Sequence, residues 1–408
     1  MGIRDSLALV LAGGAGTRLA PLTADRAKPA VPFGGKYRII DFTLANCLHS
    51  GVRRIMVLTQ YKSHSLQKHL RDGWSIFNPE LGEFITTIPP QMRGTYSWYL
   101  GTADSVYQNL SLIERNEAEA ILILSGDHIY RMDYAAMLKQ HQEAEADVTI
   151  ACMEVGVQQA SGFGVMEVDH DHRVIGFEEK PESPATLPYN RNVSLASMGI
   201  YIFSREKLFE ILNADHEEPN SSHDFGKDIM PRIHANHRVF AYMFGTDHGR
   251  VSPDGYWRDV GTIDAYYQAN MDLLEPVPSM NLYQDDWYIR TYMQQTPPAR
   301  NVSGESGTEG IFINSSVAGG TIIAGGSVNH SILFSKVFID DEAFVEDSIL
   351  FSGVRAGRKV KLRNCIVDKH VRIPDGETIG FNEELDRSRF TISEDGIVVV
   401  PKSYRFTS

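Results

Sequence analysis

A glycine-rich stretch near the N-terminus carries residues whose types and spacing suit phosphate chemistry: LVLAGGAGTRLAPLTADRAKPAVPFGG, Leu9 to Gly35. An apolar run ends at glycines, Arg18 follows, and Lys28 stands ten residues further on. Glycines between a strand and a helix let phosphates reach backbone N–H groups. Arg18 can bind phosphate oxygens with two parallel hydrogen bonds, and Lys28 adds a second positive charge. The stretch therefore predicts a phosphate-binding loop with two fixed cations.

Two familiar phosphate-binding motifs do not fit this loop. A P-loop needs a Ser or Thr after Gly-Lys to hold magnesium, whereas Gly35-Lys36 is followed by Tyr37. The dinucleotide-binding fingerprint needs a third glycine, whereas Gly14-Ala15-Gly16 is followed by Thr-Arg-Leu. P-loop proteins and dinucleotide-binding proteins of the Rossmann type are therefore excluded.

An aspartate stands where another apolar run ends, in AILILSGDHIY (120–130). The Asp127 carboxylate, with Gly126 giving close access, suits a magnesium ligand beside a triphosphate. The alternative is that Asp127 caps a helix formed by the residues that follow. His128 is interpreted as a structural or supporting residue, because no proton need be taken from a phosphate monoester dianion.

The elements that must position these residues alternate between strand-like and helix-like segments. LALVLAGG, RRIMVLTQ, EAILILSGD and ADVTIACMEV are short apolar runs, typical of strands covered on both faces. Helical patterns lie between them, for example 102–118, where Val106, Leu110 and Ile113 recur at helical spacing and Thr102 is available as a cap. This alternation predicts an α/β fold with a Rossmann-like, mostly parallel sheet, whose ligands bind beyond the carboxyl ends of the strands.

The pattern changes after Pro276, where segments rich in Pro, Gly and Ser indicate a linker. Beyond Ile311, apolar positions recur every seventeen residues. Two columns keep this phase, Ile332, Ile349 and Ile366 in one and Val337, Val354 and Val371 in the other. Together with six-residue steps inside the repeat, they predict a left-handed parallel β-helix with the branched residues in its interior, and an antiparallel β-domain is the alternative. Phe334 and Phe351 are expected to be exposed and to offer surfaces for subunit contacts.

Length and composition restrict the class of protein. The 408 residues suggest two domains, and the net charge of -13 disfavours nucleic-acid binding. The sequence lacks a run of the ~18 apolar residues that a membrane span needs, so no membrane association is expected. Three widely spaced cysteines fit reduced thiols in the cytoplasm. The predicted domain limits are 1–275 for a catalytic domain, 276–310 for a linker and 311–408 for the β-helix.

The motifs together resemble a known enzyme family. LAGGAGTRLAPLT and KPAVPFGG are similar to the signature of the sugar-1-phosphate nucleotidyltransferases. WYLGTADSVYQN, SGDHIYRMDY, GFEEKP and YWRDVGT extend the resemblance over nearly the whole chain to the bacterial ADP-glucose pyrophosphorylases (glucose-1-phosphate adenylyltransferases). The resemblance implies a cytoplasmic enzyme that makes ADP-glucose and pyrophosphate from ATP and glucose 1-phosphate for glycogen synthesis, with Mg²⁺ as cofactor.

The resemblance also implies roles for residues at matching positions. Arg18, Lys28 and Asp127 are implied to be catalytic, and Asp127 and Asp259 to bind Mg²⁺. The implied glucose 1-phosphate pocket consists of Tyr99, Gly164, Glu179, Lys180 and Ser197. The implied nucleotide site consists of Ala12, Gly13, Gly14, Gly16, Thr17, Gln91, Gly101, Thr102 and Ala103. A phosphate oxygen of the sugar phosphate would attack the α-phosphorus of ATP in line, and the cations would neutralise the charge.

Regulation and assembly are also implied by the resemblance. It suggests a homotetramer under allosteric control by metabolites, with an effector site near Arg26, Arg38, Lys369 and Lys402. The enterobacterial enzymes have a lysine and a histidine where this chain has Asp25 and Pro32, so the identity of the activator stays open.

Three alternatives to this function stay open. A related enzyme would use another base or sugar, which a comparison of ATP with GTP and UTP would decide. A bifunctional enzyme with an acyltransferase β-helix needs more than the roughly four coils that fit after Ile311. A non-catalytic regulatory subunit is expected to have lost Asp127, Arg18 or Lys180, and all three are present.

Overall fold

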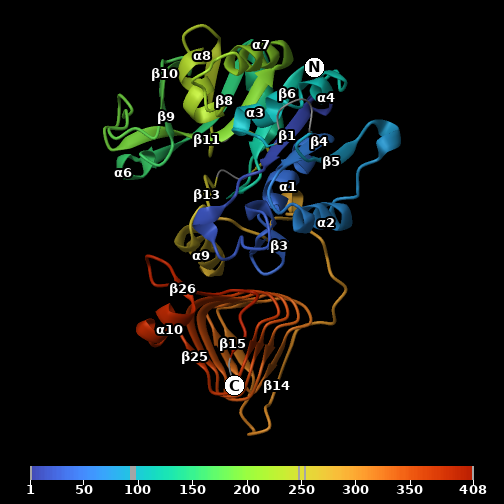
Figure 1. Ribbon diagram of the computed structural model, residues 1–408, viewed down its shortest axis with the longest axis vertical. Coiled ribbons are helices and arrows are strands. Elements are labelled where there is room, and N and C mark those ends of the chain that lie inside the picture. The colour runs from blue at the N-terminus through green and yellow to red at the C-terminus, as the bar shows by residue number, and fades with distance from the viewer. Residues whose placement is uncertain (1, 92–97, 247–248, 252–253, 407–408) are drawn as a thin grey trace.

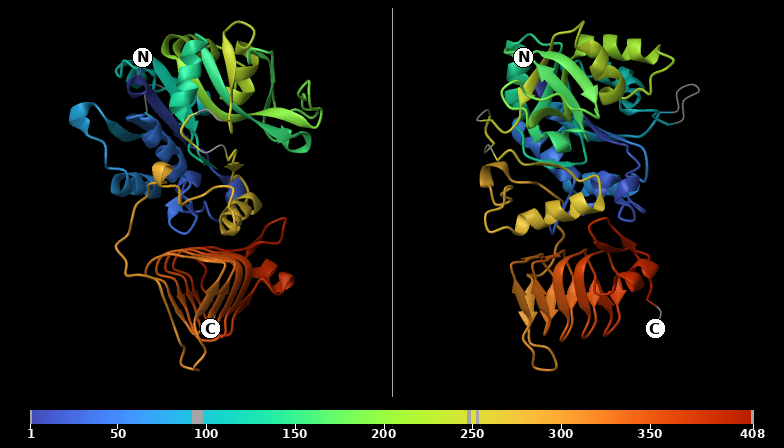
Figure 2. Two further views of the ribbon diagram at one scale, coloured as in Figure 1. Left: turned by 180° about the vertical axis from the view of Figure 1, so that it is seen from behind. Right: turned by 90° about the vertical axis from the view of Figure 1, so that its left-hand side faces the viewer.

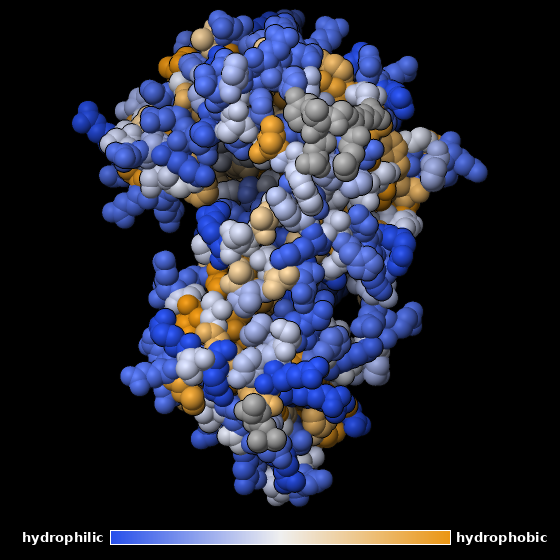
Figure 3. Space-filling model, viewed as in Figure 1, coloured by the Kyte–Doolittle hydropathy of each residue, from blue (hydrophilic) through white to orange (hydrophobic). Residues whose placement is uncertain are grey.

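The computed structural model describes residues 2–91, 98–246, 249–251 and 254–406. An α/β region and a β-helix are stacked along the long axis of the molecule, with the N-terminus in the first and the C-terminus in the second (Figure 1). The predicted fold class, an α/β domain followed by a parallel β-helix, is confirmed. Hydrophilic residues predominate on the face shown in Figure 3, and hydrophobic residues form scattered groups there. None of the helices in the described part of the chain combines the length and apolarity that crossing a membrane requires.

A nine-stranded sheet forms the centre of the α/β region. Its main path runs β10-β9-β11-β6-β1-β4-β5, with β8 beside β11 and β12 beside β8. The strands β1, β4, β5 and β6 are mutually parallel, and β11 runs antiparallel to β6. The four predicted apolar runs are strands β1, β4, β6 and β8. The bounds are β1 Leu7–Ala12, β4 Arg54–Thr59, β5 Phe84–Ile88, β6 Ala120–Ser125, β8 Val148–Gly156, β9 Gly164–Val168, β10 Val174–Glu179, β11 Val193–Ser204 and β12 Val239–Met243.

Helices cover both faces of this sheet. Ala8 and Val10 of β1 belong to one apolar cluster and Leu7 and Leu9 to another, because successive side chains of a strand point to opposite faces. The helices of the α/β region are α1 Ile40–Ser50, α2 His64–Gly73, α3 Thr102–Tyr107, α4 Leu110–Glu114, α5 Tyr134–Glu143, α6 Val157–Ala160, α7 Arg205–His216, α8 Met230–Ile233 and α9 Ile263–Met271. Burial on both faces explains why the strands are continuous apolar runs.

The predicted helix over 102–118 is wrong in two respects. It is divided into α3 and α4, because Asn109 leaves the helical conformation and its side chain bonds to the Ser105 carbonyl. Thr102 is not the cap, since Gly101 precedes the first turn. The Thr102 hydroxyl instead donates to Asp224 and accepts the backbone N–H of Phe225.

A short antiparallel ribbon joins the two motifs that carry acidic residues. It consists of β7 (His128–Tyr130) and β13 (Trp257–Asp259), and its register sets Asp259 opposite His128. Because a strand follows Asp127, the alternative that this residue caps a helix is wrong. The cap of α5 is Asp133, whose carboxylate accepts the N–H of Ala135.

The β-helix has the predicted seventeen-residue period. Ile332, Ile349 and Ile366 are direct partners in adjacent coils, all in parallel pairing. The alternative of an antiparallel β-domain is thereby wrong. Pairing begins at β14, which lies beside β17. The bounds are β14 Arg300–Val302, β15 Ile311–Ile313, β16 Ser316–Val317, β17 Ile322–Ala324, β18 Ser327–Asn329, β19 Ile332–Leu333, β20 Phe338–Ile339, β21 Phe344–Leu350, β22 Arg355–Ala356, β23 Lys361–Val367, β24 Arg372–Ile373, β25 Thr378–Ile379, β26 Thr391–Ile392 and β27 Val398–Val400, with α10 at Glu383–Arg389.

One of the two predicted interior columns is wrong. The valine column at 337, 354 and 371 lies in the core of the β-helix, whereas Ile332, Ile349 and Ile366 pack in the cluster shared with the α/β region. Phe334 and Phe351 belong to that same cluster and are buried, so they are not the exposed surfaces expected from the sequence. The β-helix therefore uses an apolar face against its own α/β region, and α9 lies at this boundary (Figure 2).

Candidate active site

Lys28 and two aspartates meet at the carboxyl ends of the central strands. The Lys28 ammonium lies 2.8 Å from Oδ2 of Asp127 and 2.9 Å from Oδ1 of Asp259. Asp127 follows β6, Asp259 ends β13, and Lys28 begins a short turn after the glycine loop. Three segments far apart in sequence thus converge on one point, at the edge of the sheet where ligands of α/β proteins bind.

The charges of this group support one another. Burial disfavours the ionised form of Asp127, but Lys28 and then His128 outweigh it, so the pKa of the carboxyl lies well below its usual value. Burial also opposes the charge of Lys28, yet Asp127 and Asp259 raise the pKa of this ammonium group. Asp127 and Lys28 are therefore both ionised at neutral pH.

The same group offers ligand atoms for a divalent cation. Asp127, His128 and Asp259 each present one ligand atom, and these atoms all lie within 4.8 Å of one another. Nε2 of His128 is 3.6 Å from Asp127 and 4.0 Å from Asp259. Asp127 and Asp259 supply carboxylate oxygens, and they already hold one cation, the Lys28 ammonium. Such an acidic pair fits Mg²⁺, which prefers oxygen ligands and retains several waters. The sequence predicts a structural or supporting role for His128, yet its ring lies beside the acidic pair. The signal in the sequence for this placement is that His128 follows Asp127 directly.

A cavity of about 230 Å³ opens beside Lys28 along the glycine loop. Gly16 in this loop has a φ of 62°, a conformation that favours glycine, and a Cβ there would meet Lys28 Cβ at 3.1 Å. The predicted residues that line the cavity are Ala12, Gly14, Gly16, Thr17, Arg18, Lys28 and Asp127.

A second cavity of about 250 Å³ adjoins the first, and both are lined by Leu11 and Arg18. It receives the predicted residues Gly164, Glu179, Lys180, Ser197, Thr102 and Asp259. The Arg18 side chain is exposed, and within the described part of the chain its guanidinium has no hydrogen-bond partner. Arg18 is therefore free to contact ligands in either cavity.

The glycine at the entrance of β9 fits its position closely. A Cβ on Gly164 would lie 2.5 Å from Phe177 and 2.8 Å from Oε2 of Glu179. The Glu179 carboxylate is also 3.6 Å from the Lys180 ammonium, and burial raises the pKa of Glu179. Gly164 thus leaves room for an acidic side chain that faces the second cavity.

Within the part of the chain that the structure describes, some predicted site residues do not line either cavity: Gly13, Tyr99, Gln91, Gly101 and Ala103. Ala103 is fully buried in the core. The hydroxyl of Tyr99 accepts a hydrogen bond from Asn109, and Gln91 donates to the carbonyl of Pro89. Sequence reasoning missed Tyr201, Asp224 and Trp257, which line the second cavity. They come from separate elements, and no spacing in the sequence links them.

Two family models and several named relatives match this chain. The nucleotidyl transferase family model matches residues 7–276, and a GlmU-like, C-terminal hexapeptide model matches 297–400. A protein of Vibrio cholerae serotype O1 named glucose-1-phosphate adenylyltransferase 2 is 62% identical over 406 residues, 100% of both chains. This chain belongs to the glucose-1-phosphate adenylyltransferase family. Relatives of the same name from Pectobacterium carotovorum and Methylobacillus flagellatus are 48% and 50% identical and cover 98% and 97% of this chain and 94% and 93% of their own lengths.

Four cations of this adenylyltransferase gather at the boundary between the α/β region and the β-helix. Arg26 pairs with Asp368 at 2.9 Å, and both side chains are buried. Arg38 donates to the carbonyl of Ala30, and Lys402 lies 3.8 Å from Asp25. Lys369, partly buried between them, has its pKa lowered to about 7, first by burial and then by Arg38 and Arg26. The predicted effector residues Arg26, Arg38, Lys369 and Lys402 are thus brought together.

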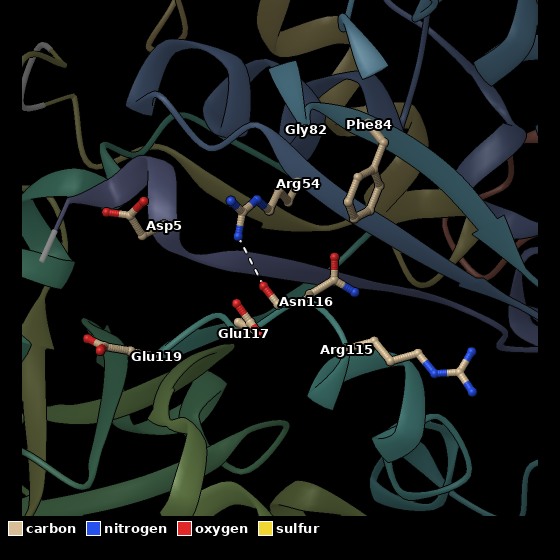
Figure 4. A pocket seen from close by; sticks show the side chains of 8 residues that line it. All are labelled: Asp5, Arg54, Gly82, Phe84, Arg115, Asn116, Glu117 and Glu119. Atoms are coloured by element: carbon tan, nitrogen blue, oxygen red, sulfur yellow. Dashed lines mark hydrogen bonds between the residues drawn. The ribbon is translucent and has the colours of Figure 1, made fainter. Parts of the chain in front are cut away.

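A larger cavity of about 770 Å³ lies at the opposite edge of the central sheet (Figure 4). Arg54, Phe84 and Glu119 stand at or next to the starts of strands there, and Arg54 donates to the carbonyl of Asn116. Its lining residues are exposed or half-buried and of both charge signs. Ligands of parallel sheets bind at the other edge, so the adenylyltransferase site is not assigned here.

Proposed function

We propose that this chain transfers the adenylyl group of ATP to glucose 1-phosphate, giving ADP-glucose and pyrophosphate for glycogen synthesis. The observation that supports this proposal most strongly is the convergence of Lys28 with Asp127 and Asp259, at 2.8 and 2.9 Å, beside two adjoining cavities. The names of the relatives support ATP and glucose 1-phosphate as the substrates.

In this proposal each cavity holds one substrate. The triphosphate of ATP lies along the glycine loop, and the sugar phosphate lies against Glu179, Lys180 and Ser197 in the second cavity. Arg18, which lines both cavities, bridges the two phosphates. The sugar phosphate oxygen is already anionic and attacks the α-phosphorus in line, so positioning and charge neutralisation supply the catalysis.

Asp127 and Asp259 would hold Mg²⁺ in the loaded enzyme, and the ion supplies charge neutralisation on the phosphate oxygens. The other roles belong to side chains of the protein. Lys28 holds the two carboxylates in place and faces the triphosphate cavity. Lys180 contributes a positive charge at the mouth of the sugar cavity, where its side chain is 65% exposed.

Pyrophosphate release from ATP and glucose 1-phosphate with MgCl₂ tests the proposal, with ADP-glucose identified by chromatography. GTP and UTP replace ATP in parallel reactions. We expect ATP to support the highest kcat/KM by at least tenfold. Equal rates with UTP or GTP would assign the chain to another base specificity, and absence of product with every nucleotide would overturn the catalytic role.

The boundary cluster supports a further part of the proposal. Arg26, Arg38, Lys369 and Lys402 would bind an anionic metabolite that acts as effector, because these four cations outnumber the acids that act on them among the described residues, Asp25, Asp41 and Asp368. We also propose a homotetramer in the cytoplasm, as the family resemblance suggests. Light scattering at micromolar concentration tests the assembly, and a monomer would contradict it.

A further inference from the structure

The turn that carries Lys28 is short and rigid. It is a buried single-turn helix, Lys28–Ala30, with Pro29 in its first turn. The N–H of Ala30 donates to the carbonyl of Ala27 at 2.9 Å, and the N–H of Val31 donates to that of Lys28 at 3.0 Å. A buried turn with a proline has little freedom to absorb a displacement at its start. Arg26 directly precedes the residues that these bonds join, so a displacement of residue 26 reaches residue 28 through two planar peptide units.

The start of this turn is held from the β-helix. Nη2 of Arg26 contacts Oδ1 of Asp368 at 2.9 Å, with side-chain exposures of 4% and 3%. Asp368 directly follows β23, and its N–H donates to the carbonyl of Val400 on the neighbouring strand β27. The acid thus stands on the rigid frame of the β-helix, while its partner lies two residues before Lys28.

A second arginine of the boundary cluster holds the end of the same turn. Nη1 of Arg38 donates to the carbonyl of Ala30 at 2.5 Å and to the hydroxyl of Ser65 at 3.0 Å. Nη1 of Arg26, by contrast, is buried without a hydrogen-bond partner among the described residues. The position of Arg26 therefore depends on Asp368, because removing that carboxylate leaves a buried charge unpaired.

We propose that Asp368 is a positioning residue for catalysis, which through its buried ion pair with Arg26 sets Lys28 between Asp127 and Asp259. The inference rests on the proposed catalytic role of Lys28. Displacement of Lys28 by a fraction of an ångström weakens contacts that are strongest in the transition state, so the loss falls on kcat rather than on KM.

The test compares Asp368→Asn with the matched variant Asp386→Asn. Asp386 is also a buried acid paired with an arginine, Arg389, but both residues of that pair lie within the β-helix. In Asp368→Asn we expect kcat to fall by about tenfold or more, with KM for ATP and for glucose 1-phosphate within twofold of wild type. In Asp386→Asn we expect kcat to stay within twofold of wild type, even when its melting temperature falls as much as that of Asp368→Asn.

Three results would overturn the inference: a wild-type kcat in Asp368→Asn, a rise in KM alone, or an equal loss of kcat in Asp386→Asn. If Asp368→Asn does not fold, Arg26→Lys keeps the charge and shortens the reach, and the same comparison of kcat with KM decides. Inactivity of the wild type with ATP and glucose 1-phosphate would count against the proposed function. The positioning role of Asp368 is tested by the ratio of variant kcat to wild-type kcat. This ratio is measured with whichever nucleotide and sugar phosphate the wild type uses.

Discussion

Asp127 and Asp259 share one cation in this structure, the Lys28 ammonium, at 2.8 and 2.9 Å. Asp127→Asn keeps the shape of the side chain and removes its charge, so it weakens both the hold on Lys28 and the site for Mg²⁺. We expect kcat to fall by about 100-fold or more, with KM for glucose 1-phosphate little changed. Steady-state pyrophosphate release measures both, and Asp171→Asn, an exposed acid, is the control. Normal turnover in Asp127→Asn would refute the magnesium site.

Lys180 is expected to act on binding instead. Its side chain is exposed at the second cavity, where it can contact the phosphate of the sugar. Lys180→Ala removes one charge-assisted contact, which is typically worth ~1.5–3 kcal/mol. We expect KM for glucose 1-phosphate to rise by about tenfold or more, while KM for ATP changes less than twofold. Lys139→Ala, which removes an exposed lysine from α5, is the control. A loss confined to kcat would assign Lys180 another role.

At the residue scale, sequence reasoning worked best where an unusual residue follows an apolar run. Arg18, Lys28 and Asp127 stand out in this way, and the structure places Lys28 and Asp127 in contact. Asp224 and Tyr201 could not be found by such reasoning, because they reach the second cavity only through the pairing of β11 and the turn after residue 223. Their roles depend on tertiary contacts that no local pattern encodes.

At the element scale, Gly164 shows how two strands fix an acidic side chain. β9 and β10 pair so that Gly164 lies opposite Glu179, and a Cβ at 164 would stand 2.8 Å from Oε2 of Glu179. In Gly164→Ala, Phe177 and Glu179 must both shift, so Glu179 leaves its present place in the wall of the second cavity. We expect KM for glucose 1-phosphate to rise by about tenfold, since part of the pocket is displaced. Gly156→Ala on β8, where a Cβ meets open space, should leave KM unchanged. Equal values in both variants would contradict this account.

The same scale shows why some elements were predicted and others were not. Strands β1, β4, β6 and β8 are apolar over their length because both faces are buried, and this signal is local. The break between α3 and α4 depends on Asn109, whose side chain bonds to the Tyr99 hydroxyl and to the backbone. In the β-helix, Ile332 and Leu333 are both apolar, because one packs against the α/β region and the other fills the coil. A repeat period gives the register but not which of two apolar neighbours points inward.

At the scale of the whole molecule, the two regions meet through both apolar and charged contacts. Phe334 and Phe351 are buried in the cluster that the α/β region shares with the β-helix, and Arg26 pairs with Asp368 across the same boundary. The sequence could not show this, because a β-helix face with large apolar residues looks the same whether it meets another subunit or its own catalytic region. The boundary therefore joins the predicted effector residues to the turn that carries Lys28.

Lys369 makes this boundary sensitive to pH. Burial, Arg38 and Arg26 lower its pKa to about 7, so the ammonium is protonated below pH 7 and loses its proton as the pH rises through 7. An anion at the cluster gains the contact only with the protonated form. We expect the affinity for sulfate, whose charge is constant over this range, to fall by about tenfold between pH 6 and pH 9. Calorimetric titration of the wild type and of Lys369→Arg measures the effect.

The arginine variant is the decisive control, because a guanidinium stays charged throughout this pH range. We expect Lys369→Arg to bind sulfate with an affinity that is nearly independent of pH and close to that of the wild type at pH 6. The same decline in both proteins would place the titrating group elsewhere. His370 follows Lys369 in the chain, but burial, Lys369 and Lys402 lower the pKa of its ring, so it would contribute only at the acidic end of this range, and His370→Asn would remove that part of the decline. The affinity that remains at pH 9 measures what the rest of the cluster contributes once Lys369 has lost its proton.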